Sequence, residues 1–228
     1  MYRRQPESRS DLVRRTRVSY DENAFHKVYR AIYDFATTDL SAVYFDVLKD
    51  RLYTAATKSH ARRSGQTALF KVHYALTRLA APLLAFTTEE VWSHTRKPAR
   101  APDSVHLALL PEPEELASGL DAVKLARWER LLEVRGVVLK ALEEARQAKF
   151  IGTSLEAQVR LAGANLDDYA DDLPALFIVS QVLLEPGSEL KVTVERAEGA
   201  KCERCWKYSV FTGPVCESCT AALREMLG

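Results

Sequence analysis

All four cysteines of this chain lie in its last twenty-seven residues, in the spacing C-x2-C-x10-C-x2-C. Two residues between paired cysteines allow a tight turn to aim both sulfurs at one point, and two such turns supply the four thiolates that tetrahedral zinc prefers. Gly213-Pro214 supplies a bend just before the second pair. The spacing therefore predicts one structural zinc ion with no open position for chemistry. The predicted ligands are Cys202, Cys205, Cys216 and Cys219.

Two disulfides are the competing interpretation of four cysteines. Disulfide frameworks belong mainly to small secreted domains, whereas this chain has 228 residues and shows no apolar signal segment at its start. Size and context therefore favour a metal site over disulfides.

The composition is that of an ordinary soluble globular protein, with 47% apolar and 28% charged residues. No run approaches the roughly 20 apolar residues that a membrane span needs, so we expect no membrane contact. The net charge of +1 conceals segregation along the chain. The first 100 residues carry 18 Lys and Arg against 10 Asp and Glu, while residues 101–120 and 161–190 contain acids and no Lys or Arg. Such segregation suits a protein with one surface facing a polyanion, although a pI near 7.7 does not require nucleic-acid binding.

The amino-terminal half is predicted to be helical after its first residues. Residues 1–20 are rich in arginine without helical periodicity and are interpreted as a mobile basic arm. From Asp21 apolar residues recur at steps of three and four, which indicates one long helix or two in tandem broken near Thr37-Thr38-Asp39. A second periodic stretch follows Gly65, and Pro82 is expected to kink or restart it. Residues 21–95 are therefore predicted to form a helical bundle.

Two further local signals follow from that pattern. Thr87 and Glu90 have the spacing of a capping box ahead of Val91-Trp92, which predicts a helix start there. Four prolines within residues 96–120 indicate a linker or domain seam, in which Val105 to Leu109 alternate as a short strand would.

The second half is predicted to be a small α+β module over residues 121–198, followed by the zinc knuckle over residues 199–228. A long helix is expected at 121–149, and short strands at 157–161, 176–184 and 190–194. The fold class is therefore mainly α. The expected buried face of the long helix consists of Trp128, Leu131, Leu132, Val138, Leu139, Leu142 and Ala145.

No catalytic centre is recognisable in the sequence. The nine glycines form neither of the phosphate-cradling motifs, and the five histidines have no carboxylate or nucleophile at motif spacing. We therefore expect no catalytic residues here.

Four segments of the chain resemble a known family. They are DLSAVYFDVLKDRLYT (39–54), LAAPLLAFTTEEVW (79–92), LEEARQAKFIGTSLEAQV (142–159) and AEGAKCERCWKYS (197–209). The family is that of the isoleucyl-tRNA synthetases, which are class I aminoacyl-tRNA synthetases. The first two segments resemble helices of that family's anticodon-binding domain, the third resembles the segment leading from that domain into the carboxy-terminal module, and the fourth resembles the zinc knuckle of that module. The first two are shared with valyl and other class I synthetases, whereas the C-x-R-C-W element favours the isoleucine family. Residues 1 to about 20 do not resemble the family.

The resemblance implies a class I anticodon-binding bundle that binds the anticodon stem and loop of isoleucine-accepting tRNA in the cytoplasm, as a monomer. The family's ATP-dependent amino-acid activation uses His-Ile-Gly-His and Lys-Met-Ser-Lys-Ser signatures, and neither occurs in this sequence. ATP is thus expected only for a catalytic domain that the sequence lacks, and the chain alone is expected to be inactive as a ligase.

Bases of an anticodon loop are bound by stacking on aromatic or guanidinium planes, while cations hold phosphates. In the knuckle we expect Arg204, Trp206 and Lys207 to meet the loop. The alternative is that Trp206 packs the knuckle and the basic residues offset the negative charge of a four-thiolate zinc site. In the bundle, six cations near the turn between the two helical stretches are expected to track phosphates. They are Lys49, Arg51, Lys58, Arg62, Arg63 and Lys71.

Two further interpretations, from other classes of protein, stay open. A similar knuckle ends the formamidopyrimidine-DNA glycosylases, which resemble one another in an amino-terminal Pro-Glu, whereas this chain begins Met1-Tyr2. The second of these is a structural adaptor whose knuckle stabilises the chain without binding RNA.

Overall fold

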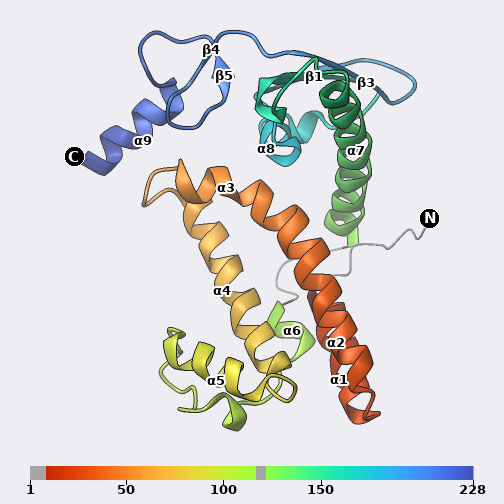
Figure 1. Cartoon of the computed structure of the whole chain (residues 1–228), viewed down its shortest axis with the longest axis vertical. Helices are drawn as coiled ribbons and strands as arrows, with labels where there is room; N and C mark the ends of the chain where they lie inside the picture. Colours follow the sequence, from red (N-terminus) through yellow and green to blue (C-terminus); the bar gives the residue numbers. More distant parts are fainter. Residues whose placement is uncertain (1–8, 117–121, 228) are drawn as a thin grey trace. The chain divides into compact units, whose positions relative to one another are not determined.

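The computed structural model describes residues 9–116 and 122–227, and the chain divides into two compact units (Figure 1). Unit 1 combines Met1–Tyr44 with Ser64–Asp121, and unit 2 combines Phe45–Arg63 with Ala122–Gly228. Within the described ranges the fold is mainly helical, as predicted, with a small sheet and the four cysteines together near the end. No helix in those ranges has the length and apolar character needed to cross a membrane.

Unit 1 is a bundle of helices around a main apolar core, with a smaller buried cluster at Ala81, Trp92 and Val105. Its core includes Leu12, Phe35, Val72 and Leu79, which come from helices at different points of the chain. The helices are α1 (Arg9–Asp21), α2 (Phe25–Asp34), most of α4 (His60–Ala80), α5 (Ala85–His94) and the short α6 (Pro113–Leu116).

The expected basic arm is wrong for the part of it that the structure describes. Residues 9–20 belong to α1, and Leu12 and Val13 are fully buried in the core of unit 1. A turn at Asn23, whose φ is 55°, lets α1 pack beside α2. The apolar stripe of α1 is only a few residues wide among arginines, which explains why no periodicity was evident. Residues 1–8 lie outside the described residues.

Of the two alternatives for the pattern from Asp21, one long helix is confirmed from Phe25 onward. α2 passes into a π-helical stretch, Phe35–Phe45, and then into α3 (Asp46–Tyr53). A π-helix adds residues to each turn without ending the helix, so Thr37 to Asp39 are accommodated with no break. The chain then turns and α4 begins at His60, before Gly65, after which the next helix was predicted to begin.

A new helix begins after α4, as expected from Pro82, but it does not begin at the predicted capping box. α4 ends at Ala80, Pro82 lies in the turn, and α5 already begins at Ala85. No side chain caps α5, and the hydroxyl of Thr88 instead donates to the Leu84 carbonyl.

The proline-rich segment packs into unit 1. The indole N–H of Trp92 donates to the Pro102 carbonyl at 3.0 Å, and Val105 is buried beside Trp92. Val105–Leu107 forms a single 3₁₀ turn, so the expected strand is wrong. Glu89 accounts for this, because its carboxylate accepts hydrogen bonds from the Ser104 hydroxyl and the Val105 N–H.

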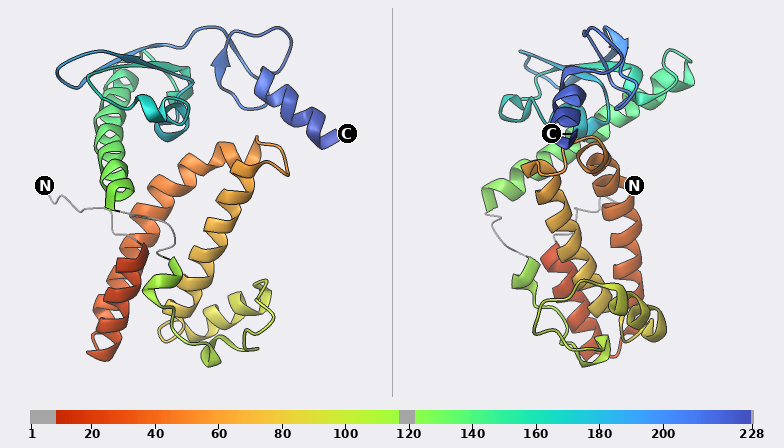
Figure 2. Two further views of the ribbon diagram at one scale, coloured as in Figure 1. Left: turned by 180° about the vertical axis from the view of Figure 1, so that it is seen from behind. Right: turned by 90° about the vertical axis from the view of Figure 1, so that its left-hand side faces the viewer.

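Unit 2 is built on a three-stranded sheet of order β2-β1-β3. The central strand β1 (Ala157–Ala162) pairs in parallel with β2 (Gln181–Glu185) and antiparallel with β3 (Lys191–Arg196). The long helix α7 (Ala122–Gln147) packs against this sheet through a shared apolar core (Figure 2). Strands at 157–161 and 190–194 were predicted within a residue or two.

Two details of unit 2 differ from the sequence prediction. The predicted strand at 176–184 begins instead with the helix α8 (Leu173–Phe177), which has Pro174 in its first turn and ends at Ile178 in the left-handed region. Trp128 is 44% exposed, so it is not part of the buried face of α7, which Val134 occupies instead.

Candidate metal centre and nucleic-acid interface

The cysteine-bearing tail is a short hairpin followed by a helix. β4 (Ala200–Lys201) pairs antiparallel with β5 (Tyr208–Ser209), and α9 (Glu217–Leu227) carries the last cysteine. Gly199 precedes the hairpin at φ +92°, where a side chain would collide with the Ser209 carbonyl. Glycine is therefore required at Gly199, since any other residue would combine backbone strain with a clash.

The structure brings the four predicted cysteines together. Their sulfur atoms all lie within 4.8 Å of one another, and those of Cys205 and Cys216 are 3.7 Å apart. Four sulfurs at about 2.3 Å from a tetrahedral ion would be about 3.8 Å apart, so the cluster has the size that such an ion needs. A disulfide would require sulfurs about 2.05 Å apart, and all four residues are free thiols in the structure. The geometry therefore fits a metal centre and not disulfides.

The surroundings of the sulfurs suit thiolates. Burial opposes ionisation of Cys202, but backbone N–H groups of the knuckle outweigh it and hold the pKa of this thiol at about 6. One of them is the Cys216 N–H, which donates to Cys202 Sγ at 3.3 Å. Burial raises the pKa of Cys205 and of Cys219. A bound cation would reverse that effect, because it lowers the pKa of every thiol that it touches.

The knuckle is tied to the sheet of unit 2 by polar contacts. The hydroxyl of Ser180 accepts a hydrogen bond from the Tyr208 N–H at 2.7 Å. Gln181 forms two hydrogen bonds with the backbone of Glu198, one through each end of its amide. The hairpin is thus anchored at the start of β2.

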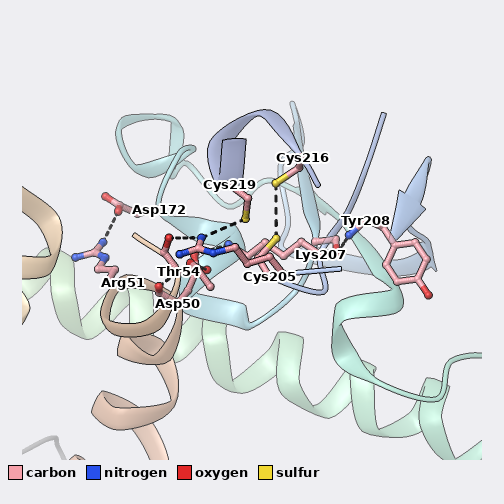
Figure 3. Close-up of polar contacts among 11 residues, drawn as sticks. Asp50, Arg51, Thr54, Asp172, Cys205, Lys207, Tyr208, Cys216 and Cys219 are labelled. Carbon is pink, nitrogen blue, oxygen red and sulfur yellow. Dashed lines mark hydrogen bonds and ion pairs between the residues drawn. The ribbon is translucent and has the colours of Figure 1, made fainter. Parts of the chain in front are cut away.

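Two basic residues of the knuckle contact the end of α3 (Figure 3). The guanidinium of Arg204 donates to the Thr54 carbonyl and also lies 3.6 Å from Cys219 Sγ. Lys207 pairs with Asp50 at 2.6 Å. Burial raises the pKa of Asp50, but hydrogen bonds from Lys207 and Thr54 outweigh it and leave the pKa below its ordinary value. Arg204 and Lys207, both predicted RNA contacts, therefore direct their charge to groups inside unit 2.

Trp206 differs from its two basic neighbours. It is 61% exposed, has a φ of 65°, and its ring has the ammonium of Lys201 5.8 Å from its centre. A non-glycine residue in the left-handed region is uncommon, and here the turn between the cysteines requires it, since the Trp206 N–H donates to the Cys202 carbonyl. The indole therefore covers little of the knuckle and faces solvent.

The predicted cations of the bundle fall into two groups. Lys49 pairs with Asp46 at 2.6 Å, and Arg51 pairs with Asp172 at 2.7 Å. Arg62 donates to the Ala55 carbonyl, so it holds the turn that follows α3. Lys58, Arg63 and Lys71 are exposed, and Lys71 lies further along α4, in unit 1.

Several residues that contact the predicted RNA-binding side chains were not themselves predicted. Asp50 and Asp172 each accept a predicted RNA-binding cation, and Lys201 lies over the predicted stacking ring. The sequence offers no signal for these partners, because residues about 120 to 160 positions apart meet only through the fold. Lys201 stands next to Cys202, so its proximity to Trp206 was the one contact within reach of local reasoning.

The fold and the cysteine cluster together define a mainly helical protein whose tail carries four cysteines placed where they could hold a metal ion. Residues 8–161 match the family model for the anticodon-binding domain of tRNA ligase. This chain belongs to that family. The match begins at residue 8, so the expectation that the first twenty residues do not resemble the family is wrong from that residue on.

The curated relatives refine this assignment. The chain is 40% identical to the isoleucine–tRNA ligase of Symbiobacterium thermophilum over 95% of its own length and 26% of the relative's. It is 43% identical to that of Syntrophotalea carbinolica and 42% identical to that of Kosmotoga olearia, in each case over 94% of this chain and 25% of the relative. The chain thus spans about a quarter of the length of the curated relatives it matches. These matches support a tRNA-binding portion of a tRNA ligase and give no support to a DNA glycosylase.

Proposed function

We propose that this chain binds the anticodon stem and loop of isoleucine-accepting tRNA and serves aminoacylation as part of an isoleucine–tRNA ligase. The observation that carries the proposal is the similarity to such ligases along 94 to 95% of the chain, with the four-cysteine tail included in one compact unit with α3. The proposal assigns tRNA recognition to this chain. It assigns amino-acid activation, with its ATP, to parts of the ligase outside this quarter of its length.

We propose zinc as the metal of the cysteine centre. Four thiolates are soft ligands that select zinc over magnesium or calcium. A tetrahedral site in which the protein fills all four positions is typical of structural zinc. The ligands are then Cys202, Cys205, Cys216 and Cys219, and the ion supplies folding energy to the tail with no reactive water.

Trp206 is the proposed stacking surface for one unpaired base. Its exposure leaves one ring face available, and Lys201 beside it offers a cation for the neighbouring phosphate. Stacking of a base on an aromatic side chain contributes about 1 to 3 kcal/mol. Arg204 and Lys207 lie next to this surface and stay within the proposed interface, where their charge adds to the local positive field even as their hydrogen bonds hold α3.

The turn after α3 is the proposed phosphate-binding element. Lys58 and Arg63 are exposed there, and Arg62 shapes the turn through the Ala55 carbonyl. Lys49 and Arg51 extend this basic segment along α3, with weaker expected effects because each pairs with an aspartate. Lys71, on the part of α4 that belongs to unit 1, is proposed as a separate phosphate contact. We also propose that the protein acts as a monomer in the cytoplasm, where tRNA is charged.

Binding of labelled isoleucine tRNA and an unrelated tRNA, each at several salt concentrations, tests the proposal. We expect preference for isoleucine tRNA and a log affinity that falls linearly with log salt. Lys58→Ala with Arg63→Ala should flatten that slope by about one unit for each phosphate that the variant no longer neutralises, and Lys191→Ala on β3 serves as the control. Equal, salt-independent affinity for both tRNAs would favour the structural adaptor.

The stacking surface has its own test. Trp206→Ala should weaken tRNA binding by about tenfold, and Trp206→Phe should restore part of the affinity because it keeps a ring. If Trp206→Ala retained zinc and fold and bound tRNA as the wild type does, Trp206 would not be part of the interface.

A further inference from the structure

One guanidinium in unit 2 touches both the cysteine cluster and the end of α3. Arg204 lies between the first two cysteines, and its Nη1 donates to the Thr54 carbonyl while lying 3.6 Å from Cys219 Sγ. Thr54 is the C-cap residue directly after α3. Arg204 therefore donates to a carbonyl at the end of a helix and lies beside the sulfur of a proposed metal ligand at the same time.

A second cation makes a parallel connection one helical turn earlier. Lys207 pairs with Asp50 at 2.6 Å, and both side chains are only about a third exposed or less. The Thr54 hydroxyl donates to Asp50 Oδ1 at 2.6 Å, so both oxygens of this carboxylate are engaged. Charge-assisted hydrogen bonds that are partly shielded from water are among the stronger polar contacts, and removal of one partner leaves the other costly to bury.

These two contacts fix the carboxy-terminal end of α3, directly before a turn that Arg62 also holds through the Ala55 carbonyl. In the segment from Thr54 to Ser59, Ala56 alone is buried, and the backbone forms a hydrogen bond from the Ser59 N–H to the Ala56 carbonyl. Further along lie the exposed cations Lys58 and Arg63. A segment with few apolar contacts opens easily unless polar contacts fix it.

We propose that the four-cysteine centre is a positioning device for this turn. Metal binding fixes the loop between Cys202 and Cys205, which carries Arg204, and the residues directly after it, which include Lys207. These two positioning residues then hold α3 and the following turn in one conformation. The consequence for RNA binding rests on the proposed function, because it requires the cations of the turn to contact phosphates. Loss of the metal would then weaken RNA binding at the turn as well as at the proposed stacking surface on Trp206.

Thermodynamic linkage makes the proposal testable by a substitution far from the cysteines in the sequence. If the metal stabilises the contact with α3, the contact must stabilise the bound metal by the same factor. A substitution at Asp50, which lies about 150 residues before the first cysteine, should therefore weaken the binding of zinc, and we expect the weaker site to release the ion faster. A merely local role of Asp50 within α3 would leave zinc release unchanged.

The experiment uses the zinc-loaded chain and two readouts that do not involve RNA. Asp50→Asn and Lys207→Met should each raise amide exchange at Ala55–Ser59 by about tenfold and raise the rate of zinc transfer to a chromophoric chelator by a similar factor. The double variant should be no faster than the singles, because the same ion pair is broken in each case. Lys191→Met is the control, an exposed lysine of β3 outside the knuckle whose substitution should change neither rate.

Arg204→Met extends the test but risks unfolding the knuckle, so the Asp50 and Lys207 variants decide. Wild-type rates of exchange and zinc release in both variants overturn the proposal. Raised rates support it, and zinc removal should then give the same exchange increase at Ala55–Ser59. If these rates rise while the wild-type chain binds no tRNA in the salt series described above, the proposed function fails and the coupling between metal and turn stands.

Discussion

The sheet layer and the cysteine tail of unit 2 are held together by different forces. Between α7 and the sheet lies a continuous apolar core, and residues such as Val138, Leu161 and Phe177 are fully buried. In the tail, residues 199–227, the buried residues are Cys202, Cys219 and Ala222, while Val210 and Leu227 are more than 80% exposed. The sheet layer is thus stabilised by hydrophobic burial, whereas the tail has so little apolar core that we expect its fold to depend on a metal ion at the four cysteines.

Metal removal gives the largest expected difference between the two regions. Structural zinc in small domains contributes about 10 kcal/mol or more of apparent folding free energy. A strong chelator, or Cys219→Ser, should therefore abolish protection of tail amides in hydrogen exchange while the amides of β1 and α7 keep theirs. Simultaneous loss in both regions would show that the sheet layer also depends on the metal.

Leu161→Ala is the converse perturbation. Leu161 is fully buried in the central strand, and removal of a buried leucine side chain costs about 2 to 5 kcal/mol. We expect faster amide exchange in β1 and α7 with stoichiometric zinc still bound, measured by metal analysis of the purified variant. Loss of zinc from this variant would contradict independent stabilisation of the tail.

A pair of glycines sharpens the comparison inside the tail. Gly199 and Gly213 both have positive φ, but a Cβ at Gly199 meets the Ser209 carbonyl while one at Gly213 meets nothing within 4 Å. Gly199→Ala adds a clash to backbone strain of about 1 to 3 kcal/mol, whereas Gly213→Ala adds strain alone. Zinc affinity by chelator competition should therefore fall for both and fall further for Gly199→Ala. Equal losses would mean that the hairpin opens to relieve the clash.

The same division of forces explains what the sequence could predict. The gathering of the four cysteines followed from their spacing alone, because ligand geometry acts over a few residues. Most of α4, which follows Gly65, and the long helix α7 followed from apolar periodicity, as did two of the strands. The helix α1 did not, since its buried stripe is narrow and lies among arginines. Asp50 and Asp172 could not be predicted as partners of cations, because an ion pair between distant residues leaves no local pattern. These are the residues that change the interpretation of Arg204, Lys207 and Arg51.

Unit 1 contains a polar contact whose contribution is expected to be smaller and dependent on pH. Arg78 is buried, and its guanidinium pairs with Glu115 of α6 at 2.6 Å. Burial raises the pKa of Glu115, but hydrogen bonds from Arg78 and from the Glu112 N–H outweigh it and hold the pKa below its ordinary value. A carboxylate with a depressed folded-state pKa stabilises the fold above the unfolded-state value of about 4.3. That stabilisation is lost as the pH falls through the lower folded-state value.

Glu115→Gln should therefore destabilise unit 1 at neutral pH by about 1 kcal/mol, a modest amount because Glu115 is partly exposed. The difference from the wild type should shrink as the pH falls below about 4.3, since the wild-type carboxylate then becomes protonated too. Amide exchange of α4, corrected for intrinsic rates at each pH, measures this difference. Glu114→Gln, on the same short helix and exposed, should show no such pH dependence. A constant difference across the pH range would mean that Glu115 acts by packing and not by its charge.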